Sequence, residues 1–319
     1  MKRSILIGII AATISILSII YFAPSAEDFY PNNPGWNGLS NLSLELHLKI
    51  VDRLFDSPLN PSSTTLLIMG PERNFTEQEA SIIESFMRSG GTVILADDFG
   101  SGNLLLRLLD LRPRFNGSLL VDPLFMERSM KFPRIRDISG DLESAGIREL
   151  VLNYATVIEG CERPLAASSF YSFLDVNLNG VWDEGEPKGP FVVACTLKVG
   201  RGELILVADS SVGINSMLAM GDNLRFIKIL SGNRMVLLDR SHWHPSRLTL
   251  AKSFVRDLAV FLSLPEVRYT AFVVVVLVIV RYKRPPRPTE SEVEKVLTKN
   301  PTWNRELLIR LEREMKNEH

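Results

Sequence analysis

The sequence lacks a marked excess of either charge. Its 319 residues include 36 lysines and arginines against 37 aspartates and glutamates, so the formal net charge is -1 at pH 7. Binding to nucleic acid depends on a surplus of basic side chains that neutralise phosphates, and the central part of the chain has no such surplus. The composition therefore gives no support to a nucleic-acid partner, and it is otherwise ordinary for a globular protein.

Two further absences bear on catalysis and on redox state. The sequence contains no G-x-S-x-G motif, so the nucleophile elbow of α/β-hydrolases is excluded. Cysteine occurs only twice, as Cys161 and Cys195, and neither lies in the C-terminal tail. If the central segment lies outside the cytoplasm, these two residues are candidates for a disulfide. Two buried free thiols are the alternative.

Long apolar segments lie near both ends of the chain. Residues 4–22 carry no charge and follow Lys2 and Arg3, and a helix of about 20 such residues spans a bilayer. We expect an uncleaved membrane anchor here, with a signal peptide as the alternative. Residues 269–280 are also apolar and precede the basic stretch RYKRPPRP (281–288). We expect a second transmembrane helix, with a valine-rich buried strand as the alternative.

Basic residues flank both apolar segments on the side of the chain ends. The positive-inside rule then predicts a cell-membrane protein with both termini cytoplasmic and the middle extracytoplasmic. N-x-[ST] sequons at Asn41, Asn74 and Asn116 are compatible with export. The predicted division is an N-terminal anchor over 1–27, an external domain over 28–263, a second membrane helix over 264–282 and a cytoplasmic helical tail over 283–319.

Apolar runs and amphipathic stretches alternate in the external segment. Residues 64–70 and 92–98 are predicted to be buried strands, separated by a helix over 76–91 that Thr76 and Glu79 open with a capping box. This order predicts a parallel sheet, and the whole a three-layer α/β domain with an antiparallel hairpin extension. The other expected elements are helices over 44–56, 101–111, 223–232 and 246–264, and strands over 149–158, 190–199, 203–209 and 234–239.

The stretch DVNLNGVWDEGEP, residues 175–187, has the spacing of a calcium loop. It fits the pattern D-x-[DN]-x-[DN]-G-x5-E, in which oxygen atoms surround a hard cation. The predicted ligands are the carbonyl of Val181 and the side chains of Asp175, Asn177, Asn179, Asp183 and Glu186. Because a strand is expected after the loop, we predict a structural calcium clip rather than an EF-hand sensor. A polar hairpin is the alternative, and no organic cofactor is implied.

A second set of polar residues follows the expected strands. Open α/β sheets bind ligands at the carboxyl ends of their strands, so we predict a ligand crevice there. Its candidate residues are Asp97, Asp98, Asp209, Ser210, Asn215, Asp222, Asn223 and His242. Together with Asp239 and His244, such a cluster could also bind a metal and activate water, which leaves a metal-dependent hydrolase as the alternative function. Capping of helices and turns is the simpler explanation of these side chains.

Three segments, beginning NNPGWNGLS, LLIMGPERNF and SSFYSFLDVN, follow one another in an order that resembles an uncharacterised archaeal and bacterial membrane-anchored family. The external domain of that family is similar to class I glutamine amidotransferases and related to domains of gliding-motility and intraflagellar-transport proteins. The resemblance implies an amidotransferase-like fold over about residues 30–265. It also implies a cysteine nucleophile on the turn LADDFGSGN (95–103), where this sequence has none, so we expect no amidotransferase activity.

The residues thus favour a membrane-anchored, non-catalytic binding or scaffold protein of the cell envelope. The membrane is one expected partner, and the tail suggests another contact. Trp303, Leu307, Leu308 and Leu311 form an apolar stripe on a predicted amphipathic helix. We expect this stripe either to lie on the membrane or to dock on a cytosolic protein.

Overall fold

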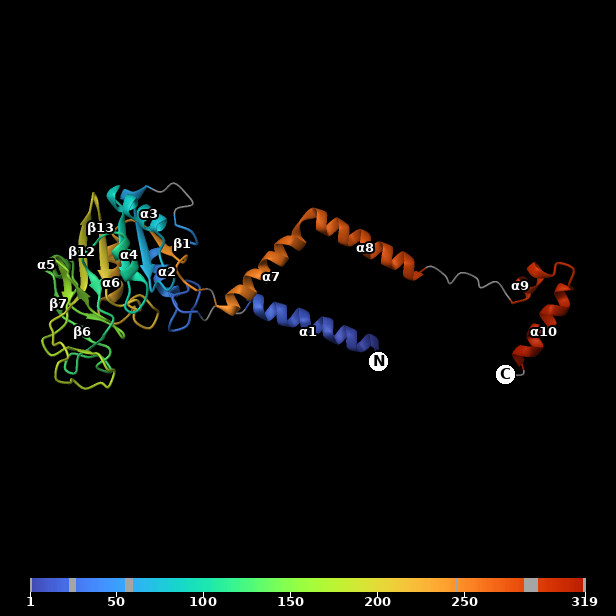
Figure 1. Ribbon diagram of the computed structural model, residues 1–319, viewed down its shortest axis with the longest axis horizontal. Coiled ribbons are helices and arrows are strands. Elements are labelled where there is room, and N and C mark those ends of the chain that lie inside the picture. Colours follow the sequence, from blue (N-terminus) through green and yellow to red (C-terminus); the bar gives the residue numbers. More distant parts are fainter. Residues whose placement is uncertain (1, 23–26, 55–59, 245, 284–291, 318–319) are drawn as a thin grey trace. The chain divides into compact units, whose positions relative to one another are not determined.

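The computed structural model describes residues 2–22, 27–54, 60–244, 246–283 and 292–317. The chain divides into two compact units, Met1–Ser253 and Phe254–His319. The first unit contains an α/β domain, seen at the left of Figure 1. The second unit is helical.

A mixed eight-stranded sheet forms the centre of the α/β domain (Figure 1). Its first five strands run parallel to one another, and the remaining three are each antiparallel to the neighbour before them. In sheet order the strands are β1 (Lys49–Val51), β14 (Met235–Asp239), β2 (Thr64–Met69), β3 (Thr92–Ala96), β13 (Gly202–Val207), β12 (Val192–Val199), β10 (Pro164–Ala167) and β7 (Asp137–Ile138). The predictions of a mostly parallel sheet and an antiparallel extension are confirmed.

The middle of the sheet is the core of the domain. Every residue of β2 and β3 is buried, as their continuous apolar runs predict for strands covered on both faces. Ile83 and Met87 from one helix and Phe226 from another are fully buried in the same cluster. Burying one such side chain stabilises the fold by about 1.5–3 kcal/mol.

Five α-helices and one short 3-10 helix, η1 (Pro61–Ser63), belong to the described part of this domain. The helices are α2 (Ser40–Leu46), α3 (Glu77–Arg88), α4 (Gly102–Leu108), α5 (Gly140–Ser144) and α6 (Asn223–Ser231). The predicted capping box opens α3: the Glu79 N–H donates to the Thr76 hydroxyl, and the Glu79 carboxylate accepts from the Thr76 N–H. This arrangement satisfies N–H groups that a helix start otherwise leaves unpaired.

The helix predicted over residues 44–56 is confirmed only at 44–46 and is wrong from residue 47 onward. The helix ends at Leu46, because His47 adopts a left-handed conformation with φ 51° that cannot continue it. Residues 49–51 instead form β1 and pair in parallel with β14 at the edge of the sheet. The apolar spacing after residue 47 therefore reflects a strand, and residues 55–59 lie outside the described part.

The single strand predicted over residues 149–158 is also wrong. The segment contains two short strands, β8 (Leu150–Val151) and β9 (Ile158–Glu159), separated by a bend at Tyr154 with φ 54°. Each joins a different two-stranded sheet. The pairs are β8 with β6 (Arg134–Ile135), β9 with β4 (Arg114–Phe115), and a third, β5 (Leu119–Val121) with β11 (Phe173–Asp175).

The N-terminal apolar segment forms α1 (Lys2–Phe22), whose residues 4–22 are long and apolar enough to cross a membrane. The same properties suit an anchor or a signal sequence. The second apolar segment is helical, so the strand alternative is wrong: α7 (Arg247–Ser263) and α8 (Pro265–Lys283) meet at a bend of 74°. Only as a pair do they meet the length and composition of one span, so the second transmembrane helix stays a prediction.

The tail has two short helices, α9 (Glu292–Lys299) and α10 (Arg305–Asn317), joined by an ion pair of 2.7 Å between Arg305 and Glu294. On α10 the side chains of Leu307 and Leu311 are exposed. Residues 284–288, the greater part of the basic stretch 281–288, lie outside the described residues.

Candidate functional site

Two neighbouring strands bring part of the predicted crevice together. Asp97 and Asp98 follow β3, and Asp209 and Ser210 follow the adjacent strand β13. The Ser210 hydroxyl donates a hydrogen bond of 2.9 Å to Asp98 Oδ2. These four residues form what we call the edge cluster, at the carboxyl ends of parallel strands where the sequence predicts it.

Asp97 closes the loop that follows β3. Its side chain is buried, Oδ1 accepts from the N–H groups of Asp98 and Gly100, and Oδ2 accepts from Gly102 at 2.7 Å. A Cβ atom on Gly102 would lie 2.5 Å from Asp97 Oδ2, so only glycine lets the backbone approach this closely. Burial, helped by the charge of Asp98, raises the pKa of Asp97 to about 6 against these hydrogen bonds.

Asp209 joins the end of β13 to a distant loop. Its carboxylate is fully buried and accepts from the N–H groups of Asn153 at 2.8 Å and Ser211 at 2.7 Å. Burial raises the pKa of Asp209 to about 7, with a smaller contribution from the charge of Asp98. The oxygens of both buried carboxylates in the edge cluster thus accept hydrogen bonds from backbone N–H groups.

Three other predicted crevice residues clamp loops elsewhere. The amide of Asn215 donates to carbonyl oxygens of residues 33 and 35. Asp222 accepts from the N–H groups of residues 148 and 149, and the buried Asn223 exchanges hydrogen bonds with the backbone of β8. The structure therefore assigns each of them a partner within the fold, and brings none of them into a hydrogen bond with the edge cluster.

His242 belongs to a separate buried cluster with a carboxylate near each ring nitrogen. Nδ1 lies 2.5 Å from Asp239 Oδ2, Nε2 lies 3.7 Å from Glu79 Oε2 without a hydrogen-bond partner, and the ring stacks on Phe75. Burial raises the pKa of Glu79, but the hydrogen bonds from Thr76 and the charge of His242 outweigh it and leave the pKa below its ordinary value. Sequence reasoning assigned Glu79 only to the capping box. The sequence did hold a signal for this contact: Glu79 follows β2, and β2 pairs with β14, the strand that precedes His242.

In the described ranges of the chain, clefts open away from the edge cluster. Clefts of about 400, 230 and 300 Å³ contain none of the edge-cluster residues; Trp243 and the candidate metal ligand His244 line the first two, and Arg163 lines the third. Within those ranges, no group of three or more histidine, cysteine, aspartate or glutamate side chains is arranged to hold a metal ion. The ligand crevice at the edge cluster stays a prediction.

The loop over residues 175–186, which we call the tip loop, connects two strands. β11 ends at Asp175, and β12 begins at Val192. The helical start that an EF-hand requires is therefore replaced by a strand. Asp175 is buried, and its two oxygens accept from the N–H groups of Asn179 at 3.0 Å and Gly180 at 2.9 Å. Gly180 takes the tight turn with φ 78°.

The remaining predicted ligands of the tip loop are linked to one another. The side-chain amides of Asn177 and Asn179 both donate to Asp183 Oδ2, at 2.6 and 2.7 Å. The two oxygens of Glu186 accept from the N–H groups of Val176 and Asp183. The polar side chains at the first, third, fifth, ninth and twelfth positions thus gather on one side of the loop. Carboxylate and amide oxygens are the donors that calcium prefers, so the residue types suit the ion, but Asp175, Asp183 and Glu186 are not arranged as a metal site in the described residues, and the calcium clip stays a prediction.

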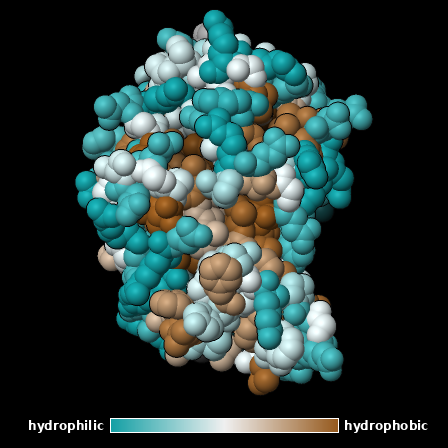
Figure 2. Space-filling view, turned by 90° about the vertical axis from the view of Figure 1, so that its left-hand side faces the viewer, coloured by the Kyte–Doolittle hydropathy of each residue, from teal (hydrophilic) through white to brown (hydrophobic). Residues whose placement is uncertain are grey.

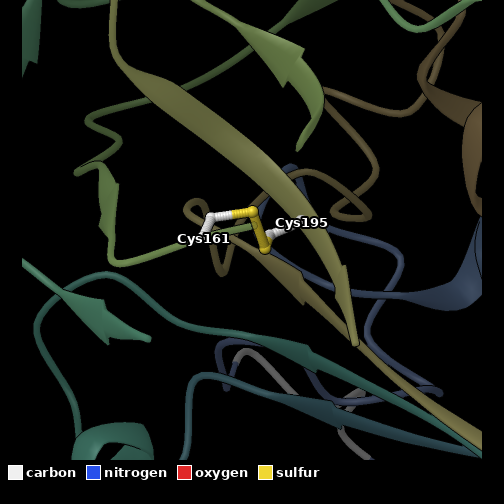
Figure 3. The surroundings of a disulfide bond; sticks show 2 residues. All are labelled: Cys161 and Cys195. Carbon is white, nitrogen blue, oxygen red and sulfur yellow. A yellow bond between two sulfur atoms is a disulfide. The ribbon is translucent and has the colours of Figure 1, made fainter. Parts of the chain in front are cut away.

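Cys161 and Cys195 form a disulfide, with their Cα atoms 6.2 Å apart (Figure 3). Cys195 lies in the buried middle of β12, and Cys161 follows β9. The bridge closes a segment of 34 residues in sequence separation, and the tip loop lies inside this segment.

Comparison with known protein families shows to which family this chain belongs. Residues 31–230 match the family described as Domain of unknown function (DUF4350). The chain belongs to the DUF4350 family. The comparison of this DUF4350 chain with curated proteins gave no match.

Among solved structures, the DUF4350 chain is similar to the mmIFT52 N-terminal domain, with 15% identity, a TM-score of 0.42, and coverage of 52% of this chain and 77% of that one. A beta-galactosidase from Bacillus circulans sp. alkalophilus has 17% identity, a TM-score of 0.32, and coverage of 52% and 22%. The GH42 beta-galactosidase Gan42B has 15% identity, a TM-score of 0.26, and coverage of 57% and 25%. The chain spans about a quarter or less of these two enzymes, and likenesses this weak carry no argument about activity.

Proposed function

We propose that this DUF4350 chain is a membrane-anchored, non-enzymatic binding or scaffold protein of the cell envelope, with a structural calcium ion in the tip loop. The proposal rests mainly on the hydrogen bonds of the edge carboxylates. Asp97 accepts three backbone N–H groups and Asp209 accepts two, and both are buried. A general base must reach a substrate proton, and oxygens that close their own loops are poorly placed to do so.

The chemistry of the tip loop supports the calcium part of the proposal. Asp175, Asp183 and Glu186 supply three carboxylates, and two asparagine amides face Asp183. Rotation of an amide by half a turn exchanges its NH2 for its oxygen, so the same side chains can serve a cation. Bound calcium would draw these oxygens together and hold β11 to the segment before β12.

The disulfide supports an external position for the domain, because such bonds persist in oxidising compartments. In this proposal α1 is an anchor, the α7–α8 pair contributes a second membrane helix, and both termini are cytoplasmic. The basic residues at 2–3 and 281–288 favour that orientation. A three-layer, amidotransferase-like arrangement of the external domain is part of the same proposal.

Protease treatment of intact cells tests the placement. Cleavage of the central domain with retention of a tag after His319 is expected, because the domain would be outside and the tag inside. Loss of the tag under these conditions contradicts the topology.

Thermal melting of the full-length chain tests the calcium ion. A ligand that binds only the folded state stabilises it by mass action, so calcium should raise the melting temperature and a chelator should reverse the rise. Alanine at both Asp175 and Glu186 should remove the difference. An identical melting curve with calcium and with chelator would return the tip loop to an ordinary polar hairpin.

One observation favours a second candidate function, a hydrolase at the edge cluster. The raised pKa values of Asp97 and Asp209, about 6 and about 7, resemble those of catalytic acids and bases. The discriminating variant is Asp98→Asn, because Asp98 is partly exposed and holds only Ser210 and one N–H group. Hydrolysis of model esters or phosphoesters that this variant abolishes would support the enzyme; no hydrolysis by the parent chain supports the binding protein.

For the tail we propose docking of the α10 stripe on the membrane or on a cytosolic protein. The exposed side chains of Leu307 and Leu311 lie on one helical face, four residues apart. A photo-cross-linker at Leu308 distinguishes the two partners. Capture of a protein supports docking on a cytosolic partner, and capture of lipid alone supports the membrane.

A further inference from the structure

α7 has an apolar face that the described chain leaves largely exposed. Phe254, Phe261 and Leu262 are 67%, 54% and 54% exposed, and no residue of α7 is buried. The amphipathic helices of the α/β domain differ in this respect, because α3 and α6 bury apolar side chains in the main core. Burial of a continuous apolar face is favourable, so α7 is suited to contact something apolar.

The side chains of α7 separate into an apolar face and a polar face. With about 3.6 residues per turn, five polar side chains share an arc of about 100°: Thr249, Lys252, Ser253, Arg256 and Ser263. Apolar side chains fill most of the remaining circumference, although Val260 lies within the polar arc and Asp257 beside it. Arg247, Lys252 and Arg256 outnumber the single acidic residue Asp257, so the helix is basic. On the face of the α/β domain in Figure 2, by contrast, apolar and hydrophilic side chains are interspersed.

A bend that the sequence determines joins α7 to the apolar helix α8. Pro265 has no N–H with which to continue the hydrogen bonding of α7. The N–H of Leu264 donates to the Phe261 carbonyl at 3.1 Å, and the Leu264 carbonyl accepts from the N–H of Arg268 at 3.0 Å, so α8 starts here. The two helices meet at 74°. When α8 stands along the bilayer normal, α7 therefore runs close to the membrane plane.

α8 is long enough to cross a bilayer without α7. Its 19 residues rise about 28 Å, close to the hydrocarbon thickness of about 30 Å. Glu266 and Arg268 lie in its first turn and Arg281 near its other end, and long basic side chains at such positions reach the polar interface. In α7, Lys252 and Arg256 lie mid-helix, where a crossing helix would carry them into hydrocarbon at a high free-energy cost. The charges thus favour α8 alone as the crossing helix.

The start of α7 is tied to the segment that follows α1. The hydroxyls of Ser246 and Thr249 both donate to the carboxylate of Glu27. Because Phe22 is the last residue of α1, the Cα atoms of Phe22 and Glu27 lie at most about 18 Å apart along the chain. A membrane that holds α1 and α8 therefore lies within reach of both ends of α7.

We propose that α7 lies on the extracytoplasmic surface of the chain's own bilayer, with its apolar face in the headgroup region and its basic face toward water. α8 alone then crosses the hydrocarbon. This position of α7 rests on the proposed membrane position of α8 and gives α7 a separate role. Helices that lie in the interface combine an apolar face with lysine and arginine on the polar face. One residue, Leu264, connects α7 to α8, so the bilayer that α8 enters is the surface nearest to α7.

Spin-label depth measurements on the full-length chain in phosphatidylcholine–phosphatidylglycerol vesicles test the proposal. Because Cys161 and Cys195 form the disulfide, a single added cysteine takes the label. Labels are placed by Arg256→Cys on the polar face, Leu258→Cys on the apolar face and Val275→Cys in the middle of α8. Oxygen, which dissolves in the bilayer, and a water-soluble nickel chelate together report the depth of each label.

The expected depths differ among the three labels. The label at 275 should be deepest, the label at 258 should lie about 5–10 Å into the boundary between headgroups and acyl chains, and the label at 256 should face water. Labels scanned from 250 to 262 should alternate in depth with a period of about 3.6 residues. The double variant Phe254→Ser/Phe261→Ser should bring the label at 258 into water. Its control, Val260→Ser, alters a side chain that is 61% exposed on the polar face and should leave that depth unchanged.

The label in α8 separates failure of this proposal from failure of the proposed function. A label at 275 that contacts water contradicts the second membrane helix itself. With that label in hydrocarbon, three results overturn the position of α7 alone. Equal access of the nickel chelate to 256 and 258 means that α7 stands free of the bilayer. A steady increase in depth from 250 to 262 makes α7 and α8 one bent span, and shielding of 258 from both reagents places α7 against protein.

Discussion

The edge cluster and the tip loop both depend on aspartate side chains and differ in the groups that donate hydrogen bonds to them. In the edge cluster, Asp97 and Asp209 each bind N–H groups of the backbone around them and share no donor. In the tip loop, Asn177 and Asn179 both turn to the single carboxylate of Asp183. Asp175 and Glu186 accept backbone N–H groups as the edge carboxylates do, so the tip loop differs at Asp183, where two side-chain amides donate to one carboxylate.

This difference follows from the chain geometry that each set serves. The edge carboxylates stand at the ends of buried parallel strands, where the chain must turn sharply and its buried and half-buried N–H groups need acceptors. An unpaired buried N–H is costly, so the carboxylate is needed for the fold itself. The tip loop is a surface connection between two strands, and its polar side chains other than the buried Asp175 are partly or fully exposed. A cation can therefore replace their mutual hydrogen bonds.

Alanine at Asp209 is the change with the largest expected effect. It leaves the half-buried N–H groups of Asn153 and Ser211 without their acceptor and removes a fully buried side chain, and should lower the free energy of unfolding by about 2–5 kcal/mol. Chemical denaturation checks this. The matched variant Asp183→Ala, in the half-exposed tip loop, should cost about 1 kcal/mol when a chelator is present. Equal losses for the two variants would erase the distinction between the regions.

Removal of the disulfide comes next. Serine at both Cys161 and Cys195 frees a loop with a sequence separation of 34 residues, and should lower the free energy of unfolding by about 3–4 kcal/mol. The freed segment contains the tip loop but not residues 97–102. Hydrogen exchange should therefore rise more at 175–186 than at 97–102, and the reverse order would contradict this account of the bridge.

The pH dependence of stability should come from the edge cluster. The folded protein holds protons on Asp97 and Asp209 up to about pH 6 and pH 7, whereas an unfolded chain releases them near pH 4. The contribution of these two groups to stability is therefore greatest below about pH 4 and declines as the pH rises to about 7, by about 4 kcal/mol between pH 5 and pH 8. Melting curves check the slope. Asp209→Asn should flatten it whatever the variant's own stability.

Breaking the contact of the tip loop with its own backbone should have the smallest effect. Glu186→Gln keeps the size of the side chain and loses its charge, so without calcium the expected loss is below about 1 kcal/mol. With calcium, the same variant should forgo the added stability that the parent gains. Melting temperatures measured with calcium and with chelator test both expectations. A large loss of stability in chelator would show that Glu186, like Asp209, is needed for the fold without calcium.

Local signals in the sequence predicted the parts of the fold that depend on local contacts. The capping box of Thr76 and Glu79, the buried strands β2 and β3, and the β12–β13 hairpin all join residues close in sequence or in one continuous apolar run. The spacing of the tip loop is likewise local. The sequence therefore sufficed for these elements.

The rest depends on partners that are remote in sequence. β5 pairs with β11 across more than fifty residues, and Asp209 accepts from Asn153 at a separation of 56. His242 meets Glu79 only because β14 lies beside β2 in the sheet. The histidine and the aspartates at strand ends therefore predicted a single crevice. In the fold, these side chains form hydrogen bonds in separate places.

Terbium luminescence tests the central claim, that the tip loop gathers its oxygens for a cation while the edge cluster does not. Terbium replaces calcium on oxygen ligands, and Trp182 in the loop can transfer excitation energy to it. The account predicts terbium emission on excitation of tryptophan in the parent chain, its loss in Glu186→Gln, and its full retention in Asp209→Asn. Emission that survives Glu186→Gln, or that disappears in a folded Asp209→Asn variant, would contradict it.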